Sequence, residues 1–489
     1  MKSSNSLVSA PINKTLLLFA LPTLGSSILQ SANGSIDAVW VGRLLGEGAL
    51  AATTNGNLVM FLLTAFVFGF GMASTILIGQ SIGRGDIHAA REVVGTAVGA
   101  FIPVALLIAI FGWFLAPGLL NALGTPTDIV PLAEDFLRIT FLAMPAILMQ
   151  TMLMMALRGS GDSLTPLIFM AIAVVLDIIL NPIFIRGYGP IPAFGIGGSA
   201  LAMALANYFS LLAMLWYIYA RDLPLRLRGK ELQLLVPSRH VLGLMFAKGL
   251  PMGIQMIVIS SSMLAMMNMV NREGVATAAA FGATQQLWTY VQMPAMALGA
   301  AVSAMAAQNI GAGRWDRVSA ITRSGIIFNL LLTGALVVIL FFADESAMAI
   351  FLGPNSEAIP IGRHIGQIST WGFIAFGVTM VLFGTIRANG QVIWPLIILF
   401  ISMYPVRIGF ALGMRGLLGV DALWLSFPVA MLATLVMASL LYLHGGWRKA
   451  APMQVDPAVE TLPANATSPV TIPTAVPVPD SQTVTSGRT

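Results

Sequence analysis

Two carboxylates lie deep within apolar stretches of the sequence. Of the twenty acidic residues, Asp37 and Asp177 are the two that fall well inside such stretches. An aspartate at the centre of a bilayer costs about 2.5–3.5 kcal/mol on insertion scales, so an acid at this depth is by default a hypothesis of function. The alternative interpretation is a structural acid that is satisfied by hydroxyl groups or by Arg407.

Amide side chains accompany both acids at helical spacing. Gln30, Asn33 and Asp37 are three and four residues apart, so they share one helix face. Asp177 and Asn181 are four residues apart and share a face as well. The oxygens of Asp37, Asp177 and Asn181 are hard ligands that would suit Na⁺. Alternatively, a carboxyl removed from water would take up a proton and carry it across.

The composition indicates where these residues lie. The chain has 489 residues, of which 57% are hydrophobic and 9% charged, and its mean hydropathy is +0.86. Soluble proteins carry about 25% charged residues, so a soluble enzyme, a nucleic-acid binder and a disordered scaffold are excluded. The chain has no cysteine, which excludes disulfides, thiol catalysis and cysteine metal sites.

Apolar runs long enough to cross a membrane follow one another along the chain. A helix needs about 20 apolar residues to span the hydrocarbon, and strict alternation typical of a membrane barrel is absent. The sequence therefore predicts an all-α polytopic membrane protein with twelve transmembrane helices. The predicted spans are 16–42, 53–79, 93–115, 133–157, 164–186, 195–219, 242–270, 278–305, 320–342, 362–387, 392–414 and 420–444.

The distribution of Lys and Arg predicts the orientation. With the N-terminus inside, eighteen of these residues lie on the inner side and six on the outer side, which places both termini in the cytoplasm. The predicted parts are a cytoplasmic N-terminus (1–14), a six-helix bundle (15–220), a basic cytoplasmic linker (221–240), a second six-helix bundle (241–444) and a disordered cytoplasmic tail (445–489).

The two halves of the chain repeat. Three segments recur at an offset of 228 or 229 residues: Leu21-Pro22 as Leu250-Pro251, GQSIGRG (79–85) as AQNIGAG (307–313), and LRGSGDSLTPLIF (157–169) as IRANGQVIWPLII (386–398). Six spans per half is an even number, so both halves enter the membrane in the same direction. Two pseudo-symmetric bundles related by an axis along the membrane normal are typical of alternating-access transporters.

The repeat is asymmetric in its chemistry. Shifted by the offset, Asp37 corresponds to Met266 and Asp177 to Val406, so only the first half keeps the acids. The second half offers methionine and aromatic residues, which would either pack and face lipid or form an adaptable wall for many cargo shapes. The candidates for that wall are Met256, Met263, Trp288, Tyr290 and Trp371. For Arg407, the favoured interpretation is a structural partner of helix ends or backbone carbonyls, and the alternative is a substrate contact.

In order along the chain, several strings resemble the multidrug and toxic compound extrusion (MATE) family over about residues 14–444. They are VGRLLGEGALAA after Asp37, the GQSIGRGD loop, LRGSGDSLTP, NPIFI and FGIGGSALA. The resemblance implies two six-helix bundles that form a V and the Na⁺- or H⁺-coupled export of cationic, amphipathic drugs. It also implies that Asp37 is the main cation-coupling residue, that Gln30 lines the same bundle, and that the first helix bends at Pro22.

The sequence departs from the family pattern at two places. The family string in the fifth span is similar to Asn-x-x-x-Asp-Pro or Asn-x-x-x-Asn-Pro, whereas here Asp177 precedes Asn181-Pro182 by one helical turn. Acids that bind Na⁺ in the second bundle of some members are missing from Met256–Ser261 and Phe373–Gly377. The first half is therefore expected to hold the coupling site.

We expect an antiporter for small-molecule drugs or toxins, driven by H⁺ or Na⁺ and without another cofactor. It would be a monomer in the bacterial cytoplasmic (inner) membrane that contacts lipid and no nucleic acid. The main alternative is a flippase for lipid-linked oligosaccharides, although no Lys or Arg lies deep in the first six spans. A membrane-embedded enzyme lacks a nucleophile–base pair here, and a channel is disfavoured by the duplicated Pro-interrupted helices.

Overall fold

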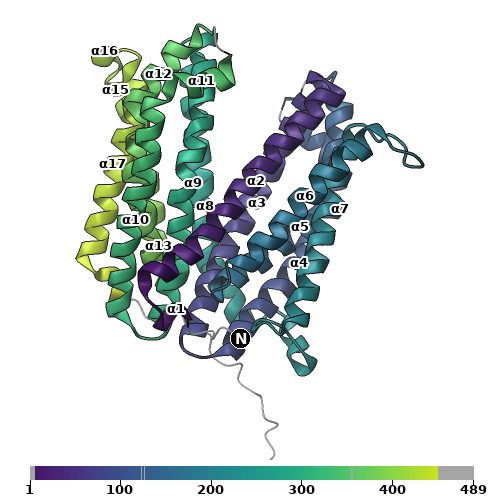
Figure 1. The fold of residues 1–489 in the computed structure, drawn as a ribbon, viewed down its shortest axis with the longest axis vertical. Coiled ribbons are helices and arrows are strands. Elements are labelled where there is room, and N and C mark those ends of the chain that lie inside the picture. The colour runs from purple at the N-terminus through teal and green to yellow at the C-terminus, as the bar shows by residue number, and fades with distance from the viewer. Residues whose placement is uncertain (1–5, 123, 126, 354–355, 450–489) are drawn as a thin grey trace, which may run out of the picture. The chain divides into compact units, whose positions relative to one another are not determined.

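A computed structural model describes residues 6–122, 124–125, 127–353 and 356–449, which belong to one compact unit. A short α1 (Ser6–Ser9) precedes six long helices that form the first bundle (purple to teal in Figure 1). They are α2 (Ile12–Leu45), α3 (Glu47–Gly83), α4 (Ile87–Ala122), α5 (Val130–Gly159), α6 (Leu164–Arg186) and α7 (Ile196–Ala220).

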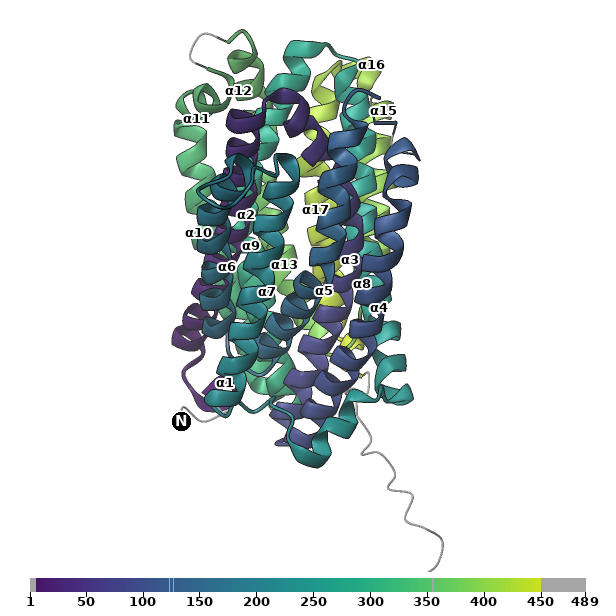
Figure 2. The ribbon, with the colours of Figure 1, turned by 90° about the vertical axis from the view of Figure 1, so that its right-hand side faces the viewer.

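The second bundle (teal to yellow in Figure 1) repeats this plan with more interruptions. Its helices are α8 (Arg239–Asn271), α9 (Val275–Gly311), α10 (Trp315–Phe342), α11 (Asp344–Leu352), α12 (Ala358–Ser369), α13 (Gly372–Ala388), α14 (Ile393–Ile401), α15 (Gly409–Gly413), α16 (Arg415–Leu418) and α17 (Asp421–His444). A π-helical turn, η2 (Ser402–Ile408), joins α14 to α15. The long helices of both bundles run along a common direction (Figure 2).

The helices match the predicted spans closely. Among the described residues, eleven helical segments are long and apolar enough to cross a membrane, and a twelfth span results if α12 and α13 are counted together. These two helices are bent by 47° relative to each other, at a break that the sequence prediction of one continuous helix over 362–387 did not include. The all-α polytopic fold is confirmed, since inside lipid a helix satisfies its own backbone hydrogen bonds.

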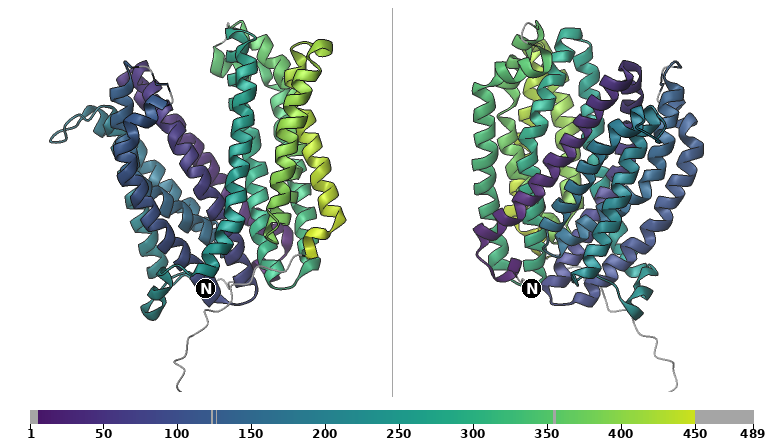
Figure 3. Two further views of the ribbon diagram at one scale, coloured as in Figure 1. Left: turned by 180° about the vertical axis from the view of Figure 1, so that it is seen from behind. Right: turned by 45° about the vertical axis from the view of Figure 1, so that its right-hand side comes forward.

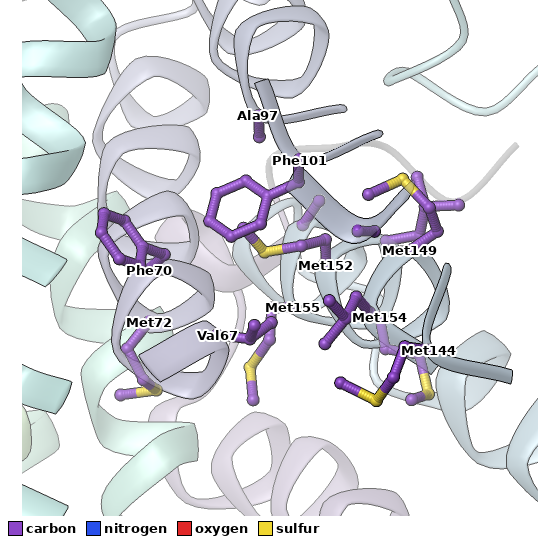
Figure 4. Close-up of a cluster of buried hydrophobic side chains, with 14 of the residues drawn as sticks. Val67, Phe70, Met72, Ala97, Phe101, Met144, Met149, Met152, Met154 and Met155 are labelled. Carbon is purple, nitrogen blue, oxygen red and sulfur yellow. The ribbon is translucent and has the colours of Figure 1, made fainter. Parts of the chain in front are cut away.

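Methionine fills much of the core of the first bundle. Figure 4 shows Met152 and Met155 of α5 facing Phe70 of α3 and Phe101 of α4. The rings of Phe70 and Phe101 meet edge to face with their centroids 5.3 Å apart. Because methionine adapts its shape to irregular gaps, these buried side chains fill the space between α3, α4 and α5.

The two bundles touch through the repeated strings. Gly83 and Gly311 occupy equivalent positions, and a Cβ atom added to either would lie 2.0 or 2.1 Å from the backbone oxygen of Gln308 or Gln80, respectively. The amides reciprocate as well: Gln80 Nε2 donates to the carbonyl of Ala388 (2.7 Å), and Gln308 Nε2 donates to that of Gly159 (3.0 Å). Each glutamine thus caps the last carbonyl of a helix in the other bundle.

These contacts lie at one end of the long helices. The ribbons of the two bundles meet at the end where α1 lies and separate toward the other end, as Figures 1 and 3 show. The close approaches of α3 to α8 and α9 involve Gly69 and Gly83, in the second half of α3. Asp37 lies near the opposite end of α2, where the bundles are apart.

The predicted linker packs against the first bundle. Its helical turn η1 (Gly229–Leu235) lies along α4, where Arg91 pairs with Glu231 (2.5 Å) and donates from Nε to the carbonyl of Pro224 (2.8 Å). At Gly99 the approach is so close that a Cβ atom would lie 1.7 Å from the oxygen of Leu235.

The chain after α17 begins with an ordered turn, η3 (Gly446–Lys449). Trp447 is buried there, accepts a hydrogen bond at its carbonyl from Asn389 Nδ2 (2.7 Å), and donates from Nε1 to the carbonyl of Tyr442 (3.0 Å). Residues 446–449 therefore differ from the predicted disordered tail, because an aromatic anchor holds them. The rest of that predicted tail, residues 450–489, lies outside the described residues.

Candidate cation site in the first bundle

The candidate site lies between α2 and α6, which pack against each other. The start of α6 is fixed by Asp162, whose carboxylate accepts hydrogen bonds from the backbone N–H groups of Leu164 (3.1 Å) and Thr165 (3.0 Å). A helix begins where a side chain satisfies its free N–H groups. From this start, about three and a half turns of helix bring Asp177 to the level of Asn33 on α2, one turn before Asp37.

The predicted acids and amides meet in two rungs between the helices. In the first rung, Asn33 Nδ2 donates to Asp177 Oδ2 (2.9 Å). In the second, one turn further along both helices, Asn181 Nδ2 donates to Asp37 Oδ1 (2.9 Å). Asn33 Nδ2 also reaches Asp37 Oδ2 at 3.2 Å, which links the rungs. We call these four residues the Asp/Asn ladder.

The ladder explains how the shifted acid of α6 fits. Each rung joins one aspartate to one asparagine, and the order is reversed between the two helices. Asp177 therefore faces an amide donor at its own level, and the carboxyl group of Asp37 lies beside it, one turn further along α2. The carboxylate of Asp177 is complemented by Asn33 on the neighbouring helix.

Three oxygens of the ladder have no hydrogen-bond partner among the described residues. They are Asn33 Oδ1, Asp177 Oδ1 and Asn181 Oδ1, and all three atoms are buried. Buried polar atoms normally have partners, so unmet oxygens beside two carboxylates fit a small hard cation or a proton. Asp177 is 2% exposed, whereas Asp37 is half-buried, so the pair extends from the accessible surface into the bundle.

A cavity of about 180 Å³ lies beside the ladder. Gln30, which is exposed, lines this cavity together with Asn33 and Asp177. The remaining lining residues come from α5, α6 and α7: Ile147, Gln150, Thr151, Met154, Met170, Ala173, Val174, Met203 and Asn207. None of these lining residues is a lysine or an arginine.

Sequence reasoning missed three polar residues of this cavity. Gln150, Thr151 and Asn207 are uncharged, so a search for charges inside spans passes over them. Gln150 Nε2 donates to Ser210 Oγ (2.9 Å), but its Oε1 is buried and has no partner among the described residues. The sequence signal that could have identified two of them is the presence of an amide within each of the apolar runs 133–157 and 195–219.

Pro22, the predicted bend, lies inside α2, which continues from Ile12 to Leu45. The carbonyl of Pro22 accepts a hydrogen bond from Ser26 Oγ (3.0 Å), and Thr23 Oγ1 bonds the carbonyl of Phe19 (3.0 Å). These hydroxyls supply donors in the turns around the proline, where the helix lacks a backbone N–H. Bending at Pro22 stays a prediction.

The predicted second-half wall is divided among several places. Trp288 is buried, donates from Nε1 to Thr370 Oγ1 (3.0 Å), and lies 5.0 Å from Phe427 between ring centroids. Trp288 and the 41% exposed Trp371 line a small cavity of about 70 Å³ between α9, α10 and α12.

The other three candidates lie elsewhere. Met263 contacts Arg407 through its sulfur, at 3.6 Å from Nη2. Met256 is half-buried and Tyr290 is 44% exposed, and neither lines one of the two cavities described above. The wall therefore stays a prediction for the present arrangement of the bundles.

Comparison with known proteins agrees with this geometry. The family model MatE matches residues 22–183 and 251–412, an offset of 229 at both ends that confirms the duplication. The chain is 32% identical over 426 residues to "Probable multidrug resistance protein YoeA" of Bacillus subtilis, covering 87% of this chain and 92% of that protein. It is 31% identical over 436 residues to "Probable multidrug resistance protein YpnP" of the same organism, covering 89% and 96%.

A solved structure has the same fold. It is described as the outward-facing conformation of a multidrug resistance MATE family transporter of the MOP superfamily. It superposes with a TM-score of 0.83 at 20% identity, over 92% of this chain and 98% of that one. With the family model and the Bacillus relatives, this likeness shows that the chain belongs to the MATE family.

Proposed function

We propose that the protein is a secondary active multidrug efflux transporter that exchanges amphipathic, mostly cationic compounds for H⁺ or Na⁺. The observation that carries this proposal is the Asp/Asn ladder, with three unmet buried oxygens next to a polar cavity. The names of the Bacillus relatives support the drug-export part. The small molecules would be carried without chemical change.

The mechanism follows from the charge of the ladder. In protein open away from the α1 end, H⁺ or Na⁺ enters at the half-buried Asp37 and neutralises the repulsion between the two carboxylates. Loss of that repulsion lets α2 and α6 pack more closely, which narrows the cavity and releases the compound. A charge moving down 100 mV supplies about 2.3 kcal/mol, or roughly a fifty-fold concentration gradient.

We infer that the end carrying α1 faces the cytoplasm of a bacterial inner membrane, because Lys and Arg are concentrated there. Closure of this end by the reciprocal glutamine contacts would leave the ladder accessible from outside. Export of lipid-linked oligosaccharides is less well supported, since recognition of a pyrophosphate requires basic residues and the lining of the first-bundle cavity has none.

Transport in everted vesicles tests the proposal. Efflux of the cationic dye rhodamine 123 should respond to a pH gradient or to a sodium gradient in the wild type. Asp37→Asn removes one carboxylate and keeps the size of the side chain, so this response should fall to background with normal membrane insertion.

Asp222→Asn is the matched control, because Asp222 lies in a cytoplasmic-side turn at a positive φ of 53° that asparagine also adopts. Wild-type export in the Asp37→Asn variant would overturn the coupling role of the ladder. An absence of response to either gradient in the wild type would reopen the flippase alternative.

A further inference from the structure

Arg407 is a buried cation for which the described residues provide no carboxylate. Its exposed fraction is 5%, and its contacts are the sulfur of Met403 (3.8 Å), the sulfur of Met263 (3.6 Å) and the ring of Phe427, whose centroid lies 3.7 Å from Cζ. Its Nε has no hydrogen-bond partner among the described residues. The expected role as a partner of backbone carbonyls finds no support in these contacts.

These contacts satisfy the guanidinium incompletely. Thioether sulfur is a weak acceptor, and an aromatic face compensates for only part of the hydration that a cation loses on burial. Arginine presents five N–H donors in a planar fork that matches the two oxygens of a carboxylate. Fully buried arginines are almost always paired, so Arg407 lacks the partner that its chemistry calls for.

The position of Arg407 in the fold is equivalent to that of the ladder. Met263 and Arg407 are 144 residues apart, as are Asn33 and Asp177, and the offset of 229 places Arg407 one residue beyond the counterpart of Asp177. The π-helical turn Ser402–Ile408 contains Arg407 and changes the side-chain register locally. Such turns often occur at functional sites.

The guanidinium lies one side-chain layer below the accessible surface. Met263 and Met403, whose sulfurs contact it, are both half-buried. Methionine has three freely rotating bonds and rearranges readily. Rotation of these two side chains would uncover the N–H edge of Arg407 while Phe427 still covers its face.

We propose that Arg407 forms a site for a monovalent anion in the second bundle, either the carboxylate of a zwitterionic transported compound or a free halide. Both ligands offer a single negative charge to the same N–H fork. The carboxylate form rests on the proposed export function, whereas the halide form does not. In either form, Met263 and Met403 act as a movable cover.

The carboxylate source is tested with two dyes that differ by one methyl group. Rhodamine 123 is the methyl ester of rhodamine 110, so the pair compares a cation with its free-acid zwitterion. In everted vesicles, Arg407→Gln should reduce export of rhodamine 110 by about tenfold, the effect of losing a charge-assisted hydrogen bond, and leave rhodamine 123 unchanged. Arg415→Gln is the matched control, because Arg415 pairs with Glu273 in the same bundle.

The halide source is tested on purified full-length protein in nanodiscs. Chloride, compared with the larger methanesulfonate at equal ionic strength, should raise the Tm of the wild type and of Arg415→Gln but not that of Arg407→Gln. If Arg407→Gln does not insert, Arg407→Lys serves in its place, because it keeps the charge without the planar fork. Arg407→Lys should also lower the ratio of rhodamine 110 export to rhodamine 123 export.

The outcomes separate this inference from the proposed function. A lower ratio of rhodamine 110 to rhodamine 123 export in Arg407→Gln than in the wild type assigns the carboxylate as the ligand. Loss of the chloride-dependent rise in Tm in Arg407→Gln assigns the halide. If the wild type exports neither dye, the export proposal fails for these compounds, and the chloride measurement still decides on Arg407. Equal behaviour of Arg407→Gln and wild type in both arms would overturn the anion site.

Discussion

The two bundles share a backbone plan but differ in charge at one level of the fold. In the first bundle, α2 and α6 bring together two acids and two amides. In the second bundle, the equivalent helices bring together Ser262, which donates to the carbonyl of Met403 (3.0 Å), and Arg407, which contacts two methionines. One level thus carries negative charge on one side and positive charge on the other.

This difference shows which parts of a duplicated protein can diverge. The reciprocal contacts of Gln80 and Gln308 are preserved in both halves, because each bundle needs the other to satisfy helix-end carbonyls. The interior level that holds the Asp/Asn ladder and Arg407 carries no such mutual requirement. It has therefore acquired opposite chemistry in the two halves, with a regular α-helix at Asp177 and a π-helical turn at Arg407.

The largest effect is expected from neutralising Asp177, one of the two acids that distinguish the first bundle. Asp177→Asn leaves the first rung with two amides and a single carboxylate in the ladder, so ion-driven export should fall to background. Measured with rhodamine 123 in everted vesicles, the double variant Asn33→Asp/Asp177→Asn should recover part of the activity, because it returns a carboxylate to the same rung. A fully coupled Asp177→Asn single variant would contradict this reading of the ladder.

A smaller effect is expected from giving the second bundle an acid of its own. Met263→Glu places a carboxylate of similar length next to Nη2 of Arg407, so an internal ion pair should replace the external anion. The ratio of rhodamine 110 to rhodamine 123 export should fall about tenfold. Met263→Gln, which is neutral and similar in size, should keep the wild-type ratio, and an unchanged ratio in Met263→Glu would argue against the anion site.

The smallest effects should be equal in the two bundles. Gly83→Ala and Gly311→Ala each force a methyl group against a backbone oxygen of the other bundle, so each should destabilise the protein by about 1–3 kcal/mol. Thermal unfolding of the purified protein measures both. Gly243→Ala is the control, since its added Cβ would meet nothing within 4 Å, and clearly unequal losses at Gly83 and Gly311 would break the symmetry of the interface.

The sequence alone was sufficient for the spans, the duplication and the acids of the ladder. The spans follow from the length of the apolar runs. The acids stand out because charged residues inside spans are rare. The sequence could not predict the pairing of Asn33 with Asp177. Helical spacing predicts which residues share a face but not which face of another helix they contact.

The features that were missed have two physical causes. The bend between α12 and α13 and the π-helical turn before Gly409 depend on packing against neighbouring helices, which hydropathy does not record. Gln150 and Asn207 were overlooked because a search for charged residues inside spans does not detect neutral amides. The surroundings of Arg407 depend on three separate helices, α8, η2 and α17, whose register only the folded chain reveals.

The reciprocal glutamine contacts have a consequence for how such a chain can be assembled. Each half supplies both the amide donor and the carbonyl acceptor, so the surface is self-complementary, as in an isologous homodimer. Two copies of one six-helix half would therefore carry both partners of each glutamine–carbonyl contact. The two halves are covalently joined through residues 221–238, and this link raises the effective concentration of one half near the other. The contact itself is specified by the surfaces of the two halves.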